Sequence, residues 1–406
     1  MEYPKLRAVE AFPTEVNGRR ILCLRDPIHV AEAVLFVPLP AVDILRYFDG
    51  THSVLDVQAA YARRNGEILF REQVEELIAM LDQHYFLESD RFMHHQKALE
   101  EAFRQSSTRA AFLAGKSYPS EPSELRQMLD EFLHHPDGPA GRGEHAAEPF
   151  RALIAPHIDY MRGAAGYAWT YRGLNERTDA EVFVIFGTAH AGTTRPFATC
   201  AKDFETPLGA VPVDHHLLQQ LRDRCSDVLA VDDIAHRTEH SIELQVILLQ
   251  HLVGTERPIR ILPILCDSFQ EQINDGKLPS DDPGVQRFLE TLRDLLETHE
   301  RPICLIAGVD LAHMGTRFGD ADPITPGLLR WIEDRDRQML ESVVAGDPDG
   351  FFSFVSREGD RRRICGLSPT YALLHLMRER KGKLLHYGQA ADPQGVVTFC
   401  SVTYPP

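Results

Sequence analysis

The feature that most constrains the fold of this sequence is a regular alternation of short apolar runs and amphipathic segments from residue 151 onward. Short apolar runs bounded by turn residues are typical of buried strands, and apolar residues at helical spacing are typical of helices that pack on a sheet. The predicted strands end at Pro156, Gly187, Leu265 and Val309, and the predicted helices span 162–174, 215–225, 239–252 and 285–299. Strands that are apolar on both faces indicate an α/β fold with a largely parallel sheet flanked by helices.

Several of these apolar runs deliver an ionisable side chain just after the strand ends. The run "RALIAPH" ends at His157, "VFVIFGTAH" ends at His190, and "ICLIAGVDLAH" reaches Asp310 and His313. In open parallel sheets, ligands bind in the crevice outside the carboxyl ends of the strands. We therefore expect these four side chains to lie in one neighbourhood, although they are far apart in the sequence. Cys266 and Asp267, which follow the strand that ends at Leu265, are expected there as well.

The pair His157 and His190 indicates a metal site. Non-haem Fe(II) in oxygenases is typically held by two histidines and a carboxylate on one face, which leaves positions open for substrate and O2. A single histidine after a strand is more often structural, but two histidines in matching strand-end contexts favour a pair of ligands. We expect Fe(II), with zinc and copper as the alternatives.

Three further side chains are candidates for catalysis in the same pocket. The segment "GVDLAH" places Asp310 and His313 on one side if the strand turns directly into a helix. Asp310 would then orient His313 and leave its other ring nitrogen to act as an acid or base, whereas the alternative is an aspartate that caps a helix beside a histidine packed for shape. His240 in "TEHSIELQ" is the third candidate, although a partly solvated first helical turn explains the neighbouring Glu239 equally well.

Composition and charge exclude some function classes. The formal net charge of -17, without a basic stripe, argues against nucleic acid as a partner. No apolar run approaches the ~20 residues that a membrane span needs, and the N-terminus lacks a secretory signal, so we expect a cytoplasmic protein without a membrane partner. The seven cysteines form no C-x-x-C pair, which favours a reduced compartment. Cys365 precedes a helix and is a candidate reactive thiol, with simple burial as the alternative.

The first part of the chain is predicted to be a separate domain. A hairpin around Asn17 and Gly18, a short helix that ends at Gly50, and amphipathic helices in 53–64 and 70–87 indicate a small winged-helix module. The order resembles the PqqD-like domains, which hold leader peptides by adding a strand to their sheet. The alternative is a regulatory or dimerisation appendage. We expect this module to span 1–92, a linker to span 93–106, and the α/β domain to span 107–406.

Motifs in the second domain resemble those of one known family. The segments "RAAFLAGKSYP", "LIAPHIDYMRGAAGYAW", "FGTAHAG", "HRTEHSIELQ", "GVDLAHMGTRFGD" and "RICGLSPTYALL" occur in the order typical of the Memo family, whose bacterial members are often called AmmeMemoRadiSam system protein B. The resemblance runs from about Arg109 to Tyr404. It implies a fold similar to that of the class III extradiol dioxygenases, non-haem iron enzymes that open catechol rings.

The resemblance also implies roles for the residues named above. It makes His157 and His190 the metal-binding histidines and places Asp310, His313 and His240 in the same pocket.

This chain departs from the family pattern at the third metal ligand. The dioxygenases use a glutamate and animal Memo proteins use a cysteine, in a loop before the final strand. Here the matching segment "HYGQAADPQGVVTFCSVTY" contains only Cys400, which lies inside the following strand, and Asp392 is the only acidic residue. We therefore expect Asp392 to complete a two-histidine, one-carboxylate site, with Asp310 as the rival carboxylate. The alternative is that Asp392 caps a turn and that water fills the third position or leaves it empty.

These inferences lead to two main function hypotheses. The first is metal-dependent redox or oxygenase-type chemistry on an unknown small-molecule or peptide substrate. The second is a non-catalytic metal-binding or peptide-binding scaffold in a modification pathway, for which the family's usual gene neighbourhood implies radical SAM and AMMECR1-like partners. A hydrolytic zinc or iron site is a third alternative.

Overall fold

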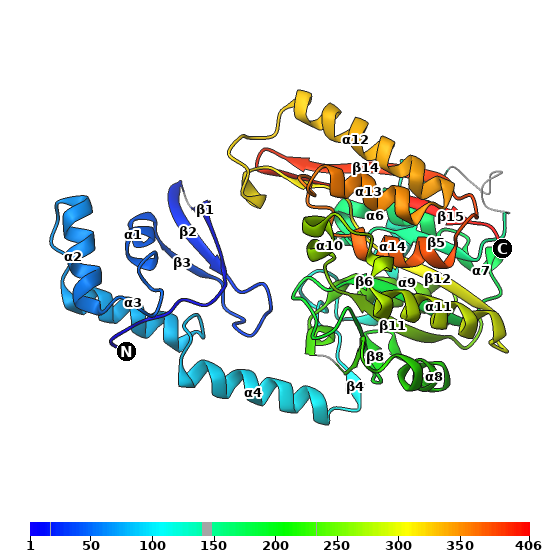
Figure 1. Cartoon of the computed structure of the whole chain (residues 1–406), viewed down its shortest axis with the longest axis horizontal. Coiled ribbons are helices and arrows are strands. Elements are labelled where there is room, and N and C mark those ends of the chain that lie inside the picture. Colours follow the sequence, from blue (N-terminus) through cyan, green and yellow to red (C-terminus); the bar gives the residue numbers. More distant parts are fainter. Residues whose placement is uncertain (17, 140–147, 233) are drawn as a thin grey trace. The chain divides into compact units, whose positions relative to one another are not determined.

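The chain divides into two compact units, Met1–Gln105 and Ser106–Pro406, in a computed structural model that describes residues 1–16, 18–139, 148–232 and 234–406. The segment predicted as a linker, 93–106, falls almost wholly within a helix, α4 (Asp90–Gln105), at the end of the first unit. Figure 1 shows α4 leading into the short strand β4 (Thr108–Arg109).

The first unit contains a small antiparallel sheet and short helices, as expected. Its strands β1 (Glu10–Val16), β2 (Arg19–Arg25) and β3 (Leu35–Pro38) pair in that order, and residue 17 of the predicted hairpin turn lies outside the described residues. The helices are α1 (Val42–Leu45), α2 (Val54–Asn65) and α3 (Arg71–Gln83). Ser53 and Asp56 form a capping box that starts α2, because each side chain accepts a hydrogen bond from the other residue's backbone N–H. The likeness to a PqqD-like module stays a prediction.

The second unit is built on a nine-stranded mixed sheet in the order β10-β7-β11-β6-β12-β5-β15-β13, with β14 paired to β15. Its four central strands, β11, β6, β12 and β5, run parallel to one another and are mostly apolar, which confirms the predicted sheet. The strands are β5 (Ala152–Ala155), β6 (Val182–Thr188), β7 (Phe197–Thr199), β10 (Leu229–Val231), β11 (Arg260–Cys266), β12 (Ile303–Gly308), β13 (His313–Met314), β14 (Lys383–Asp392) and β15 (Gly395–Tyr404). A smaller sheet joins β4 to β8 (Asp203–Thr206) and β9 (Gly209–Val211).

Helices cover both faces of the large sheet. Helices α9 and α14 both contact β6 and β12, and they belong to two separate groups of helices that pack among themselves. One group contains α5 (Pro122–Leu133), α6 (Tyr160–Tyr171) and α9 (His240–Leu252). The other contains α8 (His215–Cys225), α11 (Pro283–Thr298), α12 (Pro326–Ala345), α13 (Pro348–Arg357) and α14 (Leu367–Leu376). Two short helices, α7 (Leu174–Arg177) and α10 (Gln270–Asp275), lie in connections (Figure 1).

Two local predictions fail at the carboxyl side of the fold. The segment around Asp392, expected to be a loop, is a β-hairpin in which β14 and β15 pair from Lys383 and Thr403 to Asp392 and Gly395. The segment after β12 does not turn directly into a helix, because His313 starts the short strand β13, which pairs with β15. Among the described residues, no helix combines the length and the apolar character required to span a bilayer.

Candidate metal centre

The site begins with three neighbouring parallel strands, β5, β12 and β6, whose carboxyl ends meet at one edge of the sheet. His157 follows β5, His190 follows β6, and Asp310 follows β12. The registers pair Ala155 with Gly308 and Gly308 with Gly187, so the three strand ends are level. The sheet therefore brings these segments together as the sequence predicts.

A third histidine reaches the same edge from the first turn of α9. His157, His190 and His240 each offer a ring nitrogen, and these three atoms lie within 4.8 Å of one another. The ring centroids are 5.0 Å apart for His157 and His190 and 4.8 Å apart for His190 and His240. This spacing fits three imidazoles around one metal ion, whose Zn–N type bonds are about 2.0–2.1 Å long. His240 was expected in the pocket as a catalytic residue, but its position favours a ligand role.

Two glycines allow α9 to approach the strand ends. A Cβ atom at Gly187 would lie 2.5 Å from Ser241 Oγ, and one at Gly308 would lie 2.5 Å from the Ser241 carbonyl oxygen. Contacts this short do not occur for real side chains, so any larger residue would push the first turn of α9 away from β6 and β12. The position of His240 thus depends on glycine at two strand ends.

Hydrogen bonds fix which ring nitrogen of two histidines faces the centre. The Nδ1 atom of the buried His157 lies 2.9 Å from the Gly308 carbonyl oxygen and donates to it. The Nδ1 atom of His190 lies 3.1 Å from both carboxylate oxygens of Glu239. A histidine that donates through Nδ1 keeps the lone pair of Nε2 available for a metal, as is usual for metal-binding histidines.

The Glu239 carboxylate contacts the rings of both His190 and His240. Its carboxylate caps α9 by accepting from the backbone N–H groups of His240 and Ser241, and it accepts a third backbone hydrogen bond from His190 at 3.0 Å. Its oxygen also lies 3.3 Å from His240 Nδ1. Burial would raise the pKa of Glu239, but the two imidazoles and these donors hold it well below its usual value. The alternative explanation of Glu239, a partly solvated first helical turn, does not hold, because the residue is buried.

The pKa values of the two strand-end histidines move in opposite directions. Burial, with the neighbouring imidazoles, lowers the pKa of His157 well below its usual value, so its ring is neutral and able to bind a cation. Burial would also lower the pKa of His190, but the Glu239 carboxylate holds it well above the usual value. A metal cation at the centre would compete with a proton for His190.

A thiol also reaches the histidine cluster. Cys365 Sγ lies 3.2 Å from His157 Nε2 and 3.6 Å from the Asp310 carbonyl oxygen, and it hydrogen-bonds the His190 side chain. Gly366 makes this approach possible, because a Cβ there would lie 2.5 Å from the Val309 side chain. Burial raises the pKa of this thiol. Cys400, which the sequence predicts to lie inside the last strand, is buried in β15.

Asp310 and His313 lie at this edge but do not interact as predicted. Asp310 accepts a hydrogen bond from the His157 backbone N–H at 3.1 Å, and its other oxygen lies 3.6 Å from His157 Nε2. His313 Nδ1 instead lies 3.1 Å from the Leu311 carbonyl oxygen. Burial raises the pKa of Asp310 to about 7 and lowers that of His313 to about 4. Asp310 thus positions His157, and His313 is oriented by backbone.

Asp392 is not part of the cluster, which corrects the expectation that it supplies the third ligand. Its carboxylate accepts hydrogen bonds from the backbone N–H groups of Gln394 and Gly395 at the tip of the β14–β15 hairpin. It also forms an ion pair with Arg317 at 2.7 Å, and its side chain is 43% exposed. The physical reason is that the segment is a tight hairpin, so this carboxylate is used to cap the turn.

A pocket of about 290 Å³ opens beside the cluster. His190, Cys365 and His313 line it together with residues that follow β11, including Asp267 and Phe269. Its volume fits a small molecule at the lower end of the usual size range.

A buried ion pair holds α9 against the segment that begins at β4. Arg109, in β4, forms an ion pair with Glu243 in which both side chains are almost fully buried. Glu243 also accepts a hydrogen bond from Tyr118 and from the backbone N–H groups of Phe112 and Leu113. The sequence motif "RAAFLAG" thus anchors the helix that carries His240.

Comparisons with known proteins match the second unit and extend beyond it. The family model described as "Memo-like protein" matches residues 109–405. A MEMO1 family protein of Aquifex aeolicus is 25% identical over 95% of this chain and 94% of its own length. The MEMO1 family protein TTHA0924 of Thermus thermophilus is 30% identical over 81% of this chain and 91% of its own length. MK0963 of Methanopyrus kandleri is 28% identical. In contrast to the first two relatives, its match covers 98% of its own length but only 73% of this chain.

Among solved structures, an uncharacterized protein, JW3007, from Escherichia coli K12 matches 62% of this chain and 98% of its own chain. The TM-score is 0.37 and the sequence identity is 15%.

Proposed function

This chain belongs to the Memo family, and from that premise we propose that its second unit binds one transition-metal ion through His157, His190 and His240 and acts on a small molecule in the adjoining pocket. One observation carries the proposal: three imidazole nitrogens converge within 4.8 Å, and the opposite nitrogens of His157 and His190 already have acceptors. Histidines arranged only for packing would not need this common orientation.

The donor set fits a borderline transition metal. Imidazoles suit iron, copper and zinc, and a thiolate such as that of Cys365 favours copper and zinc in addition to iron. We propose Fe(II) first, because three imidazoles leave positions open on an ion that binds five or six ligands, with copper and zinc as the competitors to be tested. The third ligand in this proposal is His240 and not a carboxylate.

The surrounding residues have distinct tasks in this proposal. A bound metal would supply Lewis acidity and, for iron or copper, electron transfer. Glu239 and the Gly308 carbonyl hold His190 and His157 in the tautomer that binds. His313 lines the pocket, where backbone groups of Leu311 and Arg363 hold its ring, and in this proposal it contacts the substrate.

Metal content tests the first half of the proposal. The full chain is purified anaerobically, and iron, copper and zinc are measured per chain after removal of loosely bound metal. We expect about one equivalent in the parent and less than a tenth of that in the double variant His190→Ala, His240→Ala. The matched control is His215→Ala, His216→Ala, which removes two exposed histidines from α8. Full occupancy in the first double variant would refute the site.

Oxygen consumption separates an enzyme from a scaffold. The iron-loaded chain is incubated with a panel of catechols and a reductant, and O2 uptake is compared with that of the double variant. Uptake that depends on both the metal and the catechol supports oxygenase-type chemistry. Metal retention without uptake favours the alternative, a metal-binding scaffold.

A further inference from the structure

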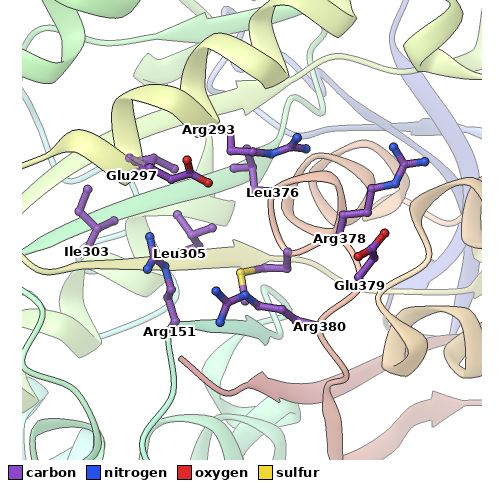
Figure 2. A pocket seen from close by; sticks show the side chains of 11 residues that line it. Arg151, Arg293, Glu297, Ile303, Leu305, Leu376, Arg378, Glu379 and Arg380 are labelled. Carbon is purple, nitrogen blue, oxygen red and sulfur yellow. The ribbon is translucent and has the colours of Figure 1, made fainter.

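A second pocket of about 390 Å³ lies at the opposite edge of the sheet from the histidine cluster. It is lined by residues at the amino ends of β5 and β12, by α11, and by the segment that follows α14 (Figure 2). Ile303, which lines this pocket, is the first residue of β12. Asp310, which lies at the histidine site, follows the last residue of the same strand by two positions. Helix α14 has ten residues, or about 15 Å of length at 1.5 Å per residue, and it runs from beside Cys365 to this pocket.

Arginine dominates the charge of this second pocket. Arg151, Arg293, Arg378 and Arg380 line it, and Figure 2 shows their long side chains around the opening. Glu297 and Glu379 line it as well, so the charged side chains sum to a net positive set. The protein as a whole carries a formal charge of -17, which makes a local excess of arginine distinctive.

The four arginines differ in how they are engaged. Arg293 donates to the carbonyl oxygen of His375 at the end of α14, and Arg378 pairs with Asp349 at 3.1 Å. Within the described part of the chain, neither Arg151 nor Arg380 has a side-chain hydrogen bond or a carboxylate within ion-pair distance. Glu297 and Glu379 line the same cavity but form no ion pair with these two arginines, so a bound anion would offset the repulsion between the two guanidinium groups.

Other arginines of the same unit show the contrast. Arg362 is buried against Asp336, and Arg363 forms an ion pair with Asp320 at 2.6 Å. These two arginines, unlike Arg151 and Arg380, therefore have carboxylate partners.

The backbone holds Arg380 firmly. Its carbonyl oxygen lies so close to Gly346 that a Cβ atom there would meet it at 2.3 Å. The Arg380 N–H donates to the Met377 carbonyl, and the Gly382 N–H donates to the Val344 carbonyl. The intervening Glu379 has φ 68°, a left-handed conformation that a non-glycine residue adopts only at a cost. A tight, strained turn therefore presents Arg378 and Arg380, and a preorganised turn loses little entropy when it binds a ligand.

Apolar side chains also line this pocket, although polar groups contribute the larger part of its exposed lining. Leu296, Ile303, Leu305, Leu376 and Met377 line it between the arginines. These residues offer a small apolar surface beside the arginines, which suits a ligand with a charged group and a small organic group.

We propose that this arginine pocket binds a small phosphate monoester, with the phosphate between Arg151 and Arg380 and the organic group on the apolar residues. A phosphate offers three terminal oxygens, so two guanidinium groups can each form paired hydrogen bonds with it. A carboxylate has only two oxygens, and one arginine satisfies it. The dianion also balances the two unpaired guanidinium charges.

Calorimetric titration tests the proposal on the full chain at low ionic strength. The probes are phenyl phosphate, inorganic phosphate and benzoate, which separate the contributions of the phosphate, the ring and a carboxylate. We expect phenyl phosphate to bind at least tenfold more tightly than benzoate and more tightly than inorganic phosphate. The double variant Arg151→Gln, Arg380→Gln should lose at least tenfold in affinity, while Arg222→Gln, Arg224→Gln on α8 should bind as the parent does.

Each result bears on the proposal. Equal binding by the Arg151→Gln, Arg380→Gln variant and the parent, or no binding by the parent, would overturn it, and benzoate binding as tightly as phenyl phosphate would overturn the choice of phosphate. The exposed single variant Arg380→Gln, checked by its thermal midpoint, replaces the double variant if Arg151→Gln does not fold. Metal content should be unchanged in the arginine variants, so that this site and the histidine site are tested separately.

Discussion

Glu239 places one carboxylate between the first turn of α9 and the ring of His190, 3.1 Å from Nδ1, and so ties two candidate ligands from distant segments to one buried group. We predict that Glu239→Gln weakens metal binding by about 10–100-fold, the range typical for loss of a partner of a metal-binding histidine. Competition with a chromogenic chelator measures the affinity.

The control for this prediction is Asp282→Asn, because Asp282 caps α11 in a similar way and has no contact with the histidine cluster. If both variants weaken metal binding equally, helix capping and not the Glu239–His190 contact explains the effect.

We predict that the sulfur of Cys365 can bond to a metal ion held by the histidines. Its sulfur lies 3.2 Å from His157 Nε2, so a bound Co(II) or Cu(II) ion would be within reach of a thiolate bond. We expect a sulfur-to-metal charge-transfer absorption in the parent that is absent in Cys365→Ala. Cys400→Ala, which removes a buried thiol from β15, should keep the band. A band that survives Cys365→Ala would exclude this thiol as a ligand.

Asp392 should be dispensable for metal binding. Because its carboxylate caps the hairpin tip and pairs with Arg317, Asp392→Ala is expected to change metal affinity by less than twofold. The lost surface ion pair should cost about 0–1 kcal/mol of stability. Chelator competition and denaturant unfolding measure the two effects. A loss of affinity above tenfold would restore Asp392 as a ligand.

The buried pair Arg109–Glu243 should stabilise the second unit. Removal of one partner leaves an uncompensated buried charge, so Arg109→Met should lower the free energy of unfolding by about 3–5 kcal/mol. Burial would raise the pKa of Glu243, but Arg109 and the hydrogen-bond donors hold it below the usual value. Its contribution is therefore present above the unfolded-state pKa and is lost as pH falls through the lower folded-state pKa.

The exposed pair Arg104–Glu101 provides the control, since Arg104→Met should change stability by less than about 1 kcal/mol. Similar losses for both arginines in urea titrations at pH 7 would contradict the assigned role of burial.

The second unit should fold and bind metal alone. The relative from Methanopyrus kandleri is matched over 98% of its length by 73% of this chain, so the family fold does not need a segment the size of the first unit. A chain that comprises residues 106–406 should be monodisperse, show a cooperative thermal transition and keep one equivalent of metal. Insolubility of this chain under conditions where the full chain is soluble would show that the units share a core.

Local sequence patterns were sufficient to predict the parallel sheet and the first two candidate metal ligands. Apolar strands alternating with amphipathic helices predict a parallel sheet, and parallel strands necessarily bring their carboxyl ends to one edge, so His157 and His190 could be placed together from their local contexts. That inference needs only local patterning and a general topological rule.

The other groups that meet at that edge, and those at the opposite edge, follow from tertiary packing. Cys365 is 208 positions from His157 in the chain, and the close approach depends on Gly366 against Val309. Asp392 seemed suitable by elimination, but β14 and β15 pair as a hairpin, and its carboxylate accepts hydrogen bonds from the backbone of the turn. Arg151 and Arg380 come from distant segments in the same way. Local sequence sets which elements form, whereas the packing of those elements sets which side chains converge, because it depends on many contacts between residues far apart in the chain.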